Sequence, residues 1–354
     1  MRILYHSPTL HSIYAQRTIL QGYQNAFLDM GHEFQILSAD QNASKVFKEW
    51  RPDLFITSSF SWYRKYLNFL DLKKFRQEGM FTLVKVDFWS SPISKLRINE
   101  APSLKNDAEF LELTQNDLYG DAYFHVVEQD DVRMDGFINA VGKPYNTIPL
   151  AVDSIGLIPA FEEKFHSDLA YIGTNLPDKR DFFKENVFPL EKKWKLRIYG
   201  QDWTRGDYLL GWMQRAGQYF NVPVLRSIRK PKMAIADEAK IYRSADISIN
   251  VHEKYQREFG GDCNERTFKI PFCGGFEVVD SVKCIHKYFP GDGEIVMAKN
   301  DKEWRDLVHY YLENPDKREV IIEAGRWRVI NEHTYHHRAQ KMLDIMARKG
   351  QSNI

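Results

Sequence analysis

The sequence predicts an α/β protein with two Rossmann-like, doubly wound domains. Strand-like apolar runs alternate with helix-length segments along the 354 residues, and the alternation starts again after a linker near the middle. Such alternation is typical of parallel strands joined by crossover helices. The length is too great for one typical hydrophobic core and suits two domains.

Six strands are predicted in the first half of the chain. Residues 2–7 form the first strand, and a helical stretch over residues 14–30 follows and ends at Gly31. Gly31 suits the end of this helix because glycine readily adopts the left-handed conformation found there. The remaining predicted strands are residues 33–39, 52–59, 81–89, 121–128 and 145–152. Their apolar composition is typical of strands buried inside a parallel sheet.

Five further strands are predicted in the second half, after a linker over residues 149–167. They are residues 167–174, 195–201, 245–252, 276–281 and 294–298. We therefore expect an N-terminal acceptor domain over residues 1–155, a C-terminal donor domain over residues 156–332 and a crossover helix over residues 333–354. The two domains are expected to face each other across a cleft, because doubly wound sheets bind ligands at the carboxyl ends of their strands.

The last helix, residues 334–348, is amphipathic and is expected to pack back on the N-terminal domain. Met342, Ile345 and Met346 lie on one face of this helix. A long apolar face of this kind must be covered by another part of the protein.

Composition excludes several classes of protein. The net charge of +1 produces no global field for nucleic acid or a membrane surface, and the basic run at residues 226–232 is interpreted as a solvated loop. No run approaches the roughly 18 apolar residues of a membrane span, and the N-terminus does not resemble a signal peptide. With only Cys263, Cys273 and Cys284 present, we expect a reduced, metal-free, cytoplasmic protein.

The stretch "NERTFKIPFCGGFEVVD", residues 264–280, contains a candidate anion site. Asn264 and Thr267 can cap a short helix, and Arg266 adds a fixed positive charge at the same end. Helix N-termini with free N–H groups bind anions. The alternative is an ordinary capped helix, which Gly274 and the glycine after it end before the next strand.

Polar residues follow several predicted strands, whereas familiar catalytic motifs are missing. The sequence contains no G-x-G-x-x-G, Walker lysine, G-x-S-x-G or H-E-x-x-H motif. The candidates after strand ends are His11, Asp87, Gly173, Thr174, Lys179, Arg180, Asn250 and His252.

Five motifs in order resemble the C-terminal half of the CgeB-like glycosyltransferases, which have the GT-B fold. The motifs are "YIGTNLPDKRDFF", "LRIYGQDW", "ADISINVH", "NERTFKIPFCGGF" and "EHTYHHRA". The resemblance covers about residues 165–350, and the N-terminal half agrees in layout only. It implies transfer of a sugar from a nucleotide-diphosphate sugar to an acceptor hydroxyl. The acceptor, whether glycan, protein, small molecule or nucleic acid, is not identified by the sequence.

The resemblance also implies which residues bind the donor. In "GTNLPDKR", Lys179 occupies the position of the lysine that holds the diphosphate, and Thr174 stands where related enzymes have an arginine that Arg180 or Arg266 would replace. The alternative is that Lys179 and Arg180 form a solvated first helical turn. The implied donor-binding residues are Gly173, Thr174, Lys179, Arg180, Asn250, His252, Asn264, Arg266 and Thr267.

Lys269 departs from the family pattern, in which a glutamate binds the ribose hydroxyls. A lysine cannot accept those hydrogen bonds. Three explanations stay open: another acceptor such as Glu265 or Asp262 replaces it, the donor differs, or the site is degenerate.

Asp87 and His11 are the candidate catalytic bases, since both follow strands that should face the cleft. A helix cap or turn is the alternative role for each. No metal and no cofactor beyond the donor are expected, because cations and helix ends can stabilise the leaving diphosphate. A nucleotide-sugar 2-epimerase-like enzyme and a non-catalytic nucleotide-sugar-binding module are the alternative functions.

Overall fold

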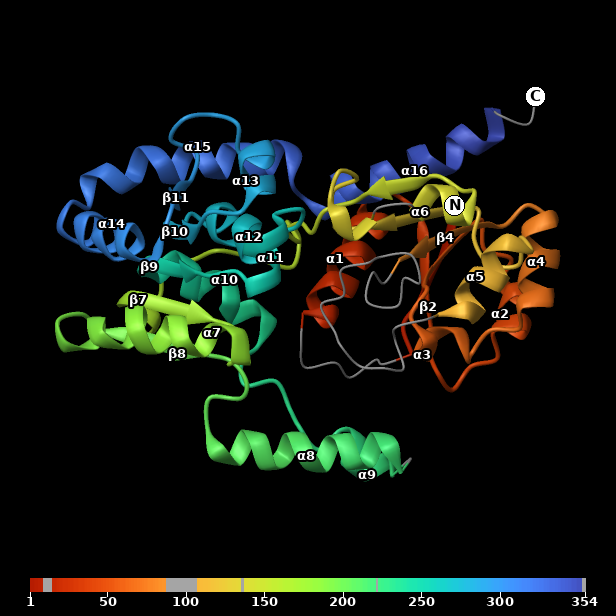
Figure 1. Cartoon of the computed structure of the whole chain (residues 1–354), viewed down its shortest axis with the longest axis horizontal. Coiled ribbons are helices and arrows are strands. Elements are labelled where there is room, and N and C mark those ends of the chain that lie inside the picture. The colour runs from red at the N-terminus through yellow and green to blue at the C-terminus, as the bar shows by residue number, and fades with distance from the viewer. Residues whose placement is uncertain (9–14, 87–106, 135–136, 221, 352–354) are drawn as a thin grey trace. The chain divides into compact units, whose positions relative to one another are not determined.

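The computed structural model describes residues 1–8, 15–86, 107–134, 137–220 and 222–351 (Figure 1). The chain divides into two compact units, each built from separate segments. Among the described residues, unit 1 draws on residues 1–8, 23–149 and 336–351, and unit 2 on residues 15–22 and 150–335.

Unit 1 contains a six-stranded sheet in the order β2-β1-β3-β4-β5-β6, with parallel neighbours. Its strands are β1 (Arg2–His6), β2 (Glu33–Leu37), β3 (Leu54–Ser58), β4 (Phe81–Lys85), β5 (Ala122–His125) and β6 (Tyr145–Thr147). All six lie inside the predicted strand ranges. Parallel pairing buries both faces, which is why these strands are almost continuously apolar.

Helices cover this sheet and complete an aromatic core. They are α1 (Gln16–Asp29), α2 (Ala43–Trp50), α3 (Ser61–Arg64), α4 (Phe69–Gln77), α5 (Ala108–Gln115) and α6 (Phe137–Val141). Phe47 of α2 meets Phe55 of β3 edge to face, with ring centroids 4.9 Å apart. Phe137 of α6 meets Tyr123 of β5 at 5.7 Å. Such edge-to-face pairs stabilise the sheet–helix interface beyond the area they bury.

The last helix, α16 (Tyr335–Gln351), belongs to unit 1 from His336 onward. Ala339, Met342 and Ile345 are buried on one face of the helix. Arg338 donates from Nε to the carbonyl of Pro149 at 2.9 Å. The prediction that the C-terminal helix packs back on the N-terminal domain is confirmed.

Unit 2 contains a second parallel sheet, of five strands in the order β11-β10-β9-β7-β8. The strands are β7 (Ser167–Ile172), β8 (Leu196–Tyr199), β9 (Ala245–Asn250), β10 (Glu277–Asp280) and β11 (Val296–Ala298). They match the five strands predicted for the second half. The predicted fold class, two Rossmann-like parallel-sheet domains, is therefore confirmed.

The helices of unit 2 pack on both faces of this sheet or extend from it. They are α7 (Pro177–Phe182), α8 (Arg205–Tyr219), α9 (Pro223–Arg226), α10 (Ile235–Ser244), α11 (Lys254–Phe259), α12 (Arg266–Phe272), α13 (Lys283–Tyr288), α14 (Asp301–Glu313) and α15 (Asp316–Glu332). Trp304 of α14 is buried against Phe182, with ring centroids 5.0 Å apart, and donates from its indole nitrogen to the Val278 carbonyl at 3.0 Å. This bond satisfies the polar atom of a large core side chain.

The three cysteines lie inside unit 2, and each is a buried free thiol. Burial raises the pKa of Cys263 and of Cys273 above that of an ordinary thiol. Because the thiolate is the reactive form, burial protects these side chains twice, by restricting access and by disfavouring ionisation.

Candidate functional site

The candidate site lies at the carboxyl ends of three adjacent strands of unit 2. Gly173 follows β7, Asn250 ends β9 and Asp280 ends β10. In the sheet these strands are neighbours in the order β10-β9-β7. Parallel strands bring their carboxyl ends to one edge, so residues distant in sequence converge there.

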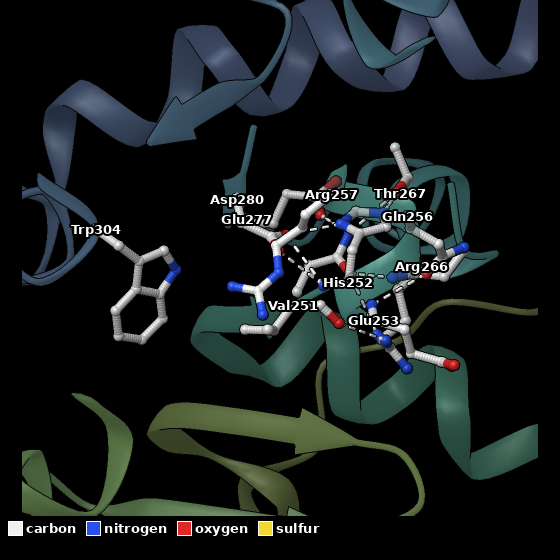
Figure 2. A network of polar contacts seen from close by, with 12 residues as sticks. Val251, His252, Glu253, Gln256, Arg257, Arg266, Thr267, Glu277, Asp280 and Trp304 are labelled. Carbon is white, nitrogen blue, oxygen red and sulfur yellow. Dashed lines mark hydrogen bonds and ion pairs between the residues drawn. The ribbon is translucent and has the colours of Figure 1, made fainter. Parts of the chain in front are cut away.

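Arg266 bonds to backbone at the ends of β7 and β9. Figure 2 shows its side chain in the polar network that also contains His252 and Asp280. Its guanidinium donates to the carbonyl of Ile172 at 3.2 Å, to the carbonyl of Val251 at 3.1 Å and to the side-chain oxygen of Asn250 at 3.2 Å. It also lies over the ring of Tyr171, 5.2 Å from the centroid. These three bonds use three of the five guanidinium N–H groups, so two stay available for an anion.

Asn250 is the centre of the network and is fully buried. Its amide nitrogen donates to Glu277 Oε2 at 2.7 Å and to Thr267 Oγ1 at 3.1 Å. Its amide oxygen accepts from Asn264 Nδ2 at 2.9 Å, as well as from Arg266. Asn264 in turn accepts the backbone N–H of Arg266 at 2.9 Å. The structure thus brings Asn250, Asn264, Arg266 and Thr267 together.

His252 forms a buried pair with Asp280. The His252 backbone N–H donates to both carboxylate oxygens at 3.0 Å, and Nδ1 lies 2.7 Å from Oδ1. Arg257 Nε lies 3.6 Å from the same carboxylate. Burial opposes ionisation of Asp280, but His252 and then Arg257 outweigh it and lower its pKa. His252 is thereby held in place, with Nε2 3.3 Å from Thr267 Oγ1.

Glu277 is a buried carboxyl group that the sequence analysis did not single out. One oxygen accepts from Asn250, and the other, Oε1, has no hydrogen-bond partner among the described residues. Burial raises the pKa of Glu277 to about 8, although the bond from Asn250 favours the charged form. The only sequence signal is one glutamate in the apolar run "FEVV".

Lys179 is almost fully buried beside Arg266, although it carries an ammonium group. Its ion-pair partner among the described residues is Glu253, whose Oε1 lies 4.0 Å from Nζ, and no hydrogen bond joins them. Burial first, and then the charge of Arg266, lower the pKa of Lys179 to about 7, although Glu253 and Asp280 oppose the shift. Lys179 and Arg266 therefore form a pair of neighbouring cations with unused hydrogen-bonding capacity.

Gly173 and Gly200 lie where the ends of β7 and β8 meet. Gly173 N–H donates to the carbonyl of Tyr199 at 2.9 Å. Gly200 has a φ of 134°, and a Cβ atom there would lie 2.2 Å from the carbonyl oxygen of Gly173. Only glycine fits this close approach between the segments that follow the parallel strands β7 and β8.

Arg180 points toward α8 and makes no bond in the network around Asn250. Its guanidinium donates to the hydroxyl of Tyr208 at 2.6 Å and lies over that ring, 5.4 Å from the centroid. Thr174 is partly buried, and its carbonyl accepts from the Leu176 N–H at 2.9 Å. The candidate bases Asp87 and His11 lie outside the described residues.

Lys269 lies in a separate buried network and not at the strand ends. Its ammonium is 3.0 Å from Glu265 Oε2 and 3.3 Å from Glu238 Oε1. Glu265 also accepts from Thr18 at 2.9 Å and from the Tyr335 hydroxyl at 2.6 Å. Lys269, where the resemblance to the CgeB-like enzymes implies a ribose-binding glutamate, thus forms ion pairs inside unit 2.

The described residues contain neither a cluster of metal ligands nor a helix suited to cross a membrane. Within those residues no group of three or more His, Cys, Asp and Glu side chains is placed to hold a metal ion. No described helix combines the length and the apolar character needed to cross a membrane.

Comparisons with known proteins concern the fold and the C-terminal half of the chain. Residues 180–344 match a family model described as glycosyl transferase-like. No curated protein matches the chain. Similar solved structures include the sucrose-phosphate synthase of Thermosynechococcus elongatus, with a TM-score of 0.61 and 11% identity over 99% of this chain and 100% of that one.

Two structures of an alpha-glucosyltransferase are also similar. The complex with UDP has a TM-score of 0.64 and 12% identity over 98% of this chain and 100% of that one. The complex with UDP-glucose and DNA containing an abasic site has a TM-score of 0.61 and 11% identity over 98% and 99%. At such identities the likeness shows the fold, which is GT-B. The class that these comparisons define is therefore a GT-B protein whose residues 180–344, slightly less than half of the chain, resemble glycosyltransferases.

Proposed function

We propose that the protein transfers a sugar from a uridine-diphosphate sugar to an acceptor hydroxyl, and that Lys179 and Arg266 bind the donor diphosphate. The observation that supports this most strongly is Lys179, a buried ammonium with no hydrogen bond to a described residue. A buried charge is costly unless it is paired. A diphosphate at this edge of the sheet would supply the missing partner.

The uridine nucleotide is proposed from the similar structures, whose descriptions name UDP and UDP-glucose. In the proposed reaction the bond between the anomeric carbon and the β-phosphate oxygen breaks, and its electron pair stays on UDP. The acceptor oxygen bonds to the anomeric carbon, and its proton passes to a base. Asp87 and His11 are the proposed candidates for that base.

Metal independence is part of the same proposal. Two cations aimed at the leaving diphosphate can stabilise the charge that develops on it in the transition state. Activity retained in EDTA would agree with this. Activity that EDTA abolishes and magnesium restores would contradict it, while leaving the assignment of Lys179 intact.

Calorimetric titration with UDP and UDP-glucose tests the donor site. Lys179→Met should weaken binding about ten-fold or more, because a charge-assisted hydrogen bond contributes roughly 1.5–3 kcal/mol. Lys184→Met, which changes an exposed lysine five residues further along the chain, is the matched control and should bind normally. Unchanged affinity in folded Lys179→Met would contradict the proposed site.

Nuclear magnetic resonance of the donor then separates the possible activities. Release of UDP together with a new glycosidic signal on an added acceptor, or slow hydrolysis without one, supports transfer. Interconversion of the sugar's epimers with UDP still attached would instead support the epimerase-like alternative. Binding with no chemical change across a panel of acceptors would contradict the proposed transfer.

A further inference from the structure

A helical arm extends from unit 2 between β8 and β9. We use the name α8–α9 arm for residues 204–232, which contain both helices. Figure 1 shows α8 and α9 set apart from the β7–β11 sheet and joined to it by two stretches of irregular chain. Because the arm lies apart from the sheet, much of its surface is free to contact another molecule.

Two ion pairs close the base of the arm. Arg229 lies 2.7 Å from Asp202, and Lys232 lies 2.7 Å from Asp207. Asp207 also forms a capping box with Thr204 at the start of α8. These contacts join the two ends of the arm, so it is a defined element of the fold and not an irregular loop.

The arm exposes large apolar side chains, which a globular protein normally buries. Trp212 is 68% exposed, Leu209 64% and Val224 79%. The other exposed side chains of this kind in the arm include Met213, Phe220 and Val222. Leu209, Trp212 and Met213 are three or four positions apart and therefore share one face of α8. A cluster of exposed apolar side chains of this kind marks a surface that binds another molecule.

The arm is also strongly basic. It contains six arginine and lysine residues and one acidic residue, a formal charge of +5 in a chain whose total is +1. Arg205, Arg215 and Lys230 have no carboxylate within ion-pair distance among the described residues. The partner of this surface must therefore accept apolar side chains and carry negative charge.

We propose that the α8–α9 arm binds the surface of a bilayer that contains anionic lipids. Trp212 and the aliphatic side chains would enter the boundary between headgroups and acyl chains, and the arginines and lysines would contact lipid phosphates. Basic, aromatic-containing helices that bind without crossing a bilayer combine these two features. Lysine and arginine stems can lie along the apolar boundary while their charges reach the headgroups.

Two other partners fit the observations less well. A second copy would bring two arms of +5 together, which repel each other. A nucleic acid would satisfy the charge, and Trp212 and Phe220 could stack on bases, but it would leave Leu209, Val222 and Val224 without an apolar partner. Charge complementarity together with apolar exposure therefore favours the lipid surface.

Co-sedimentation with unilamellar vesicles tests the proposal. We expect the whole chain to bind vesicles of equal phosphatidylcholine and phosphatidylglycerol, and to bind pure phosphatidylcholine at least ten-fold more weakly. Leu209→Ser with Trp212→Ser should reduce binding to the anionic vesicles at least ten-fold. Arg215→Gln should reduce it about five-fold, and raising the salt concentration should weaken the wild type further.

Trp327→Ser is the matched control, because Trp327 is 60% exposed on α15, outside the arm. It should bind vesicles as the wild type does. The proposal is overturned if the wild type does not bind, or if the arm variant binds as tightly as the Trp327 variant. It is also overturned if light scattering shows a dimer of the wild type that the Leu209→Ser, Trp212→Ser variant does not form. Release of the protein from the vesicles by an oligonucleotide at the same concentration of negative charge would overturn it as well.

Discussion

Lys179 connects the candidate donor site to pH. Its pKa of about 7 lies well below that of an ordinary lysine because the side chain is buried beside Arg266. Only the protonated form can bind a diphosphate. We therefore expect the affinity for UDP to fall as the pH rises from about 7 to 9, by up to ten-fold per unit until the pKa of the bound state is reached.

Calorimetry at several pH values checks this expectation against Lys179→Arg. Arginine keeps its charge throughout this range, so the variant should lose most of the pH dependence even if its absolute affinity changes. A wild-type affinity that is flat between pH 7 and 9 would contradict a diphosphate contact at Lys179.

Glu277 should make stability depend on pH in the opposite sense from an ordinary carboxylate. Its folded-state pKa of about 8 exceeds the unfolded value of 4.5. The protonated carboxyl group therefore stabilises the folded state fully below pH 4.5. This contribution to the free energy of unfolding is lost as the pH rises toward 8, by at most about 1.4 kcal/mol per pH unit. Urea denaturation should show that Glu277→Gln removes this slope, and an identical slope in the variant would refute the assignment.

Residue types at strand ends could be predicted, but their partners could not. Asn250 and Arg266 were candidates because the end of a parallel strand and a capped helix are visible in sequence. Glu277 was missed because it lies at the start of its strand, not at the end. It belongs to the polar network only through the hydrogen bond that it accepts from Asn250. The donor role of Arg180 stays a prediction, and its bond to Tyr208, 28 positions away, is a contact that the sequence does not reveal.

At the scale of the elements, the close approach of the segments that follow the parallel strands β7 and β8 depends on Gly200. Gly200→Ala should lower the free energy of unfolding by about 2–4 kcal/mol, because φ is positive and the added carbon would overlap the Gly173 carbonyl. Gly206→Ala, in the first turn of α8, is the control. The nearest atom to its added carbon is Thr204 Oγ1, 3.9 Å away. This variant should be neutral or stabilise by up to about 1 kcal/mol.

Thermal and urea denaturation measure both variants. Equal stabilities for the Gly200 and Gly206 variants would show that the strand ends can separate without cost. A loss confined to Gly200→Ala would instead support the steric account.

The eleven strands were predictable because parallel strands are continuous apolar runs bounded by polar residues and glycine. The α8–α9 arm was not. Its basic end at residues 226–232 was interpreted as a solvated loop. In the structure α9 ends at Arg226, and the two cations Arg229 and Lys232 form ion pairs at the base of the arm. Apolar residues in such a segment suggest a buried helix, and sequence alone does not reveal that their side chains are exposed.

At the scale of the whole molecule, unit 2 is assembled from segments that are far apart in the chain. The Lys269 network joins Thr18, Glu238, Glu265 and Tyr335. Thr18 is not recognisable in the sequence as part of this unit, because α1 is one continuous helix whose two halves belong to different units. Only the fold brings these positions together.

Lys269→Met should lower the free energy of unfolding by about 3–5 kcal/mol at neutral pH, because two buried carboxylates would lose their cation. Lys269→Glu, which introduces the glutamate of the CgeB-like pattern, should lower the free energy of unfolding further, because it adds a third buried carboxylate. Lys240→Met, which removes a partly exposed ion pair with Glu162, should cost at most about 1 kcal/mol. Urea midpoints that coincide for the Lys269→Met and Lys240→Met variants would contradict the structural role of Lys269.

The burial of all three thiols makes the native chain a ready background for site-specific labelling. A single cysteine placed at Val224, which is 79% exposed, would be the accessible thiol in a molecule whose own cysteines are shielded. A maleimide dye should then attach at one position without removing Cys263, Cys273 or Cys284. An environment-sensitive dye at this position would report directly whether the tip of the arm leaves water.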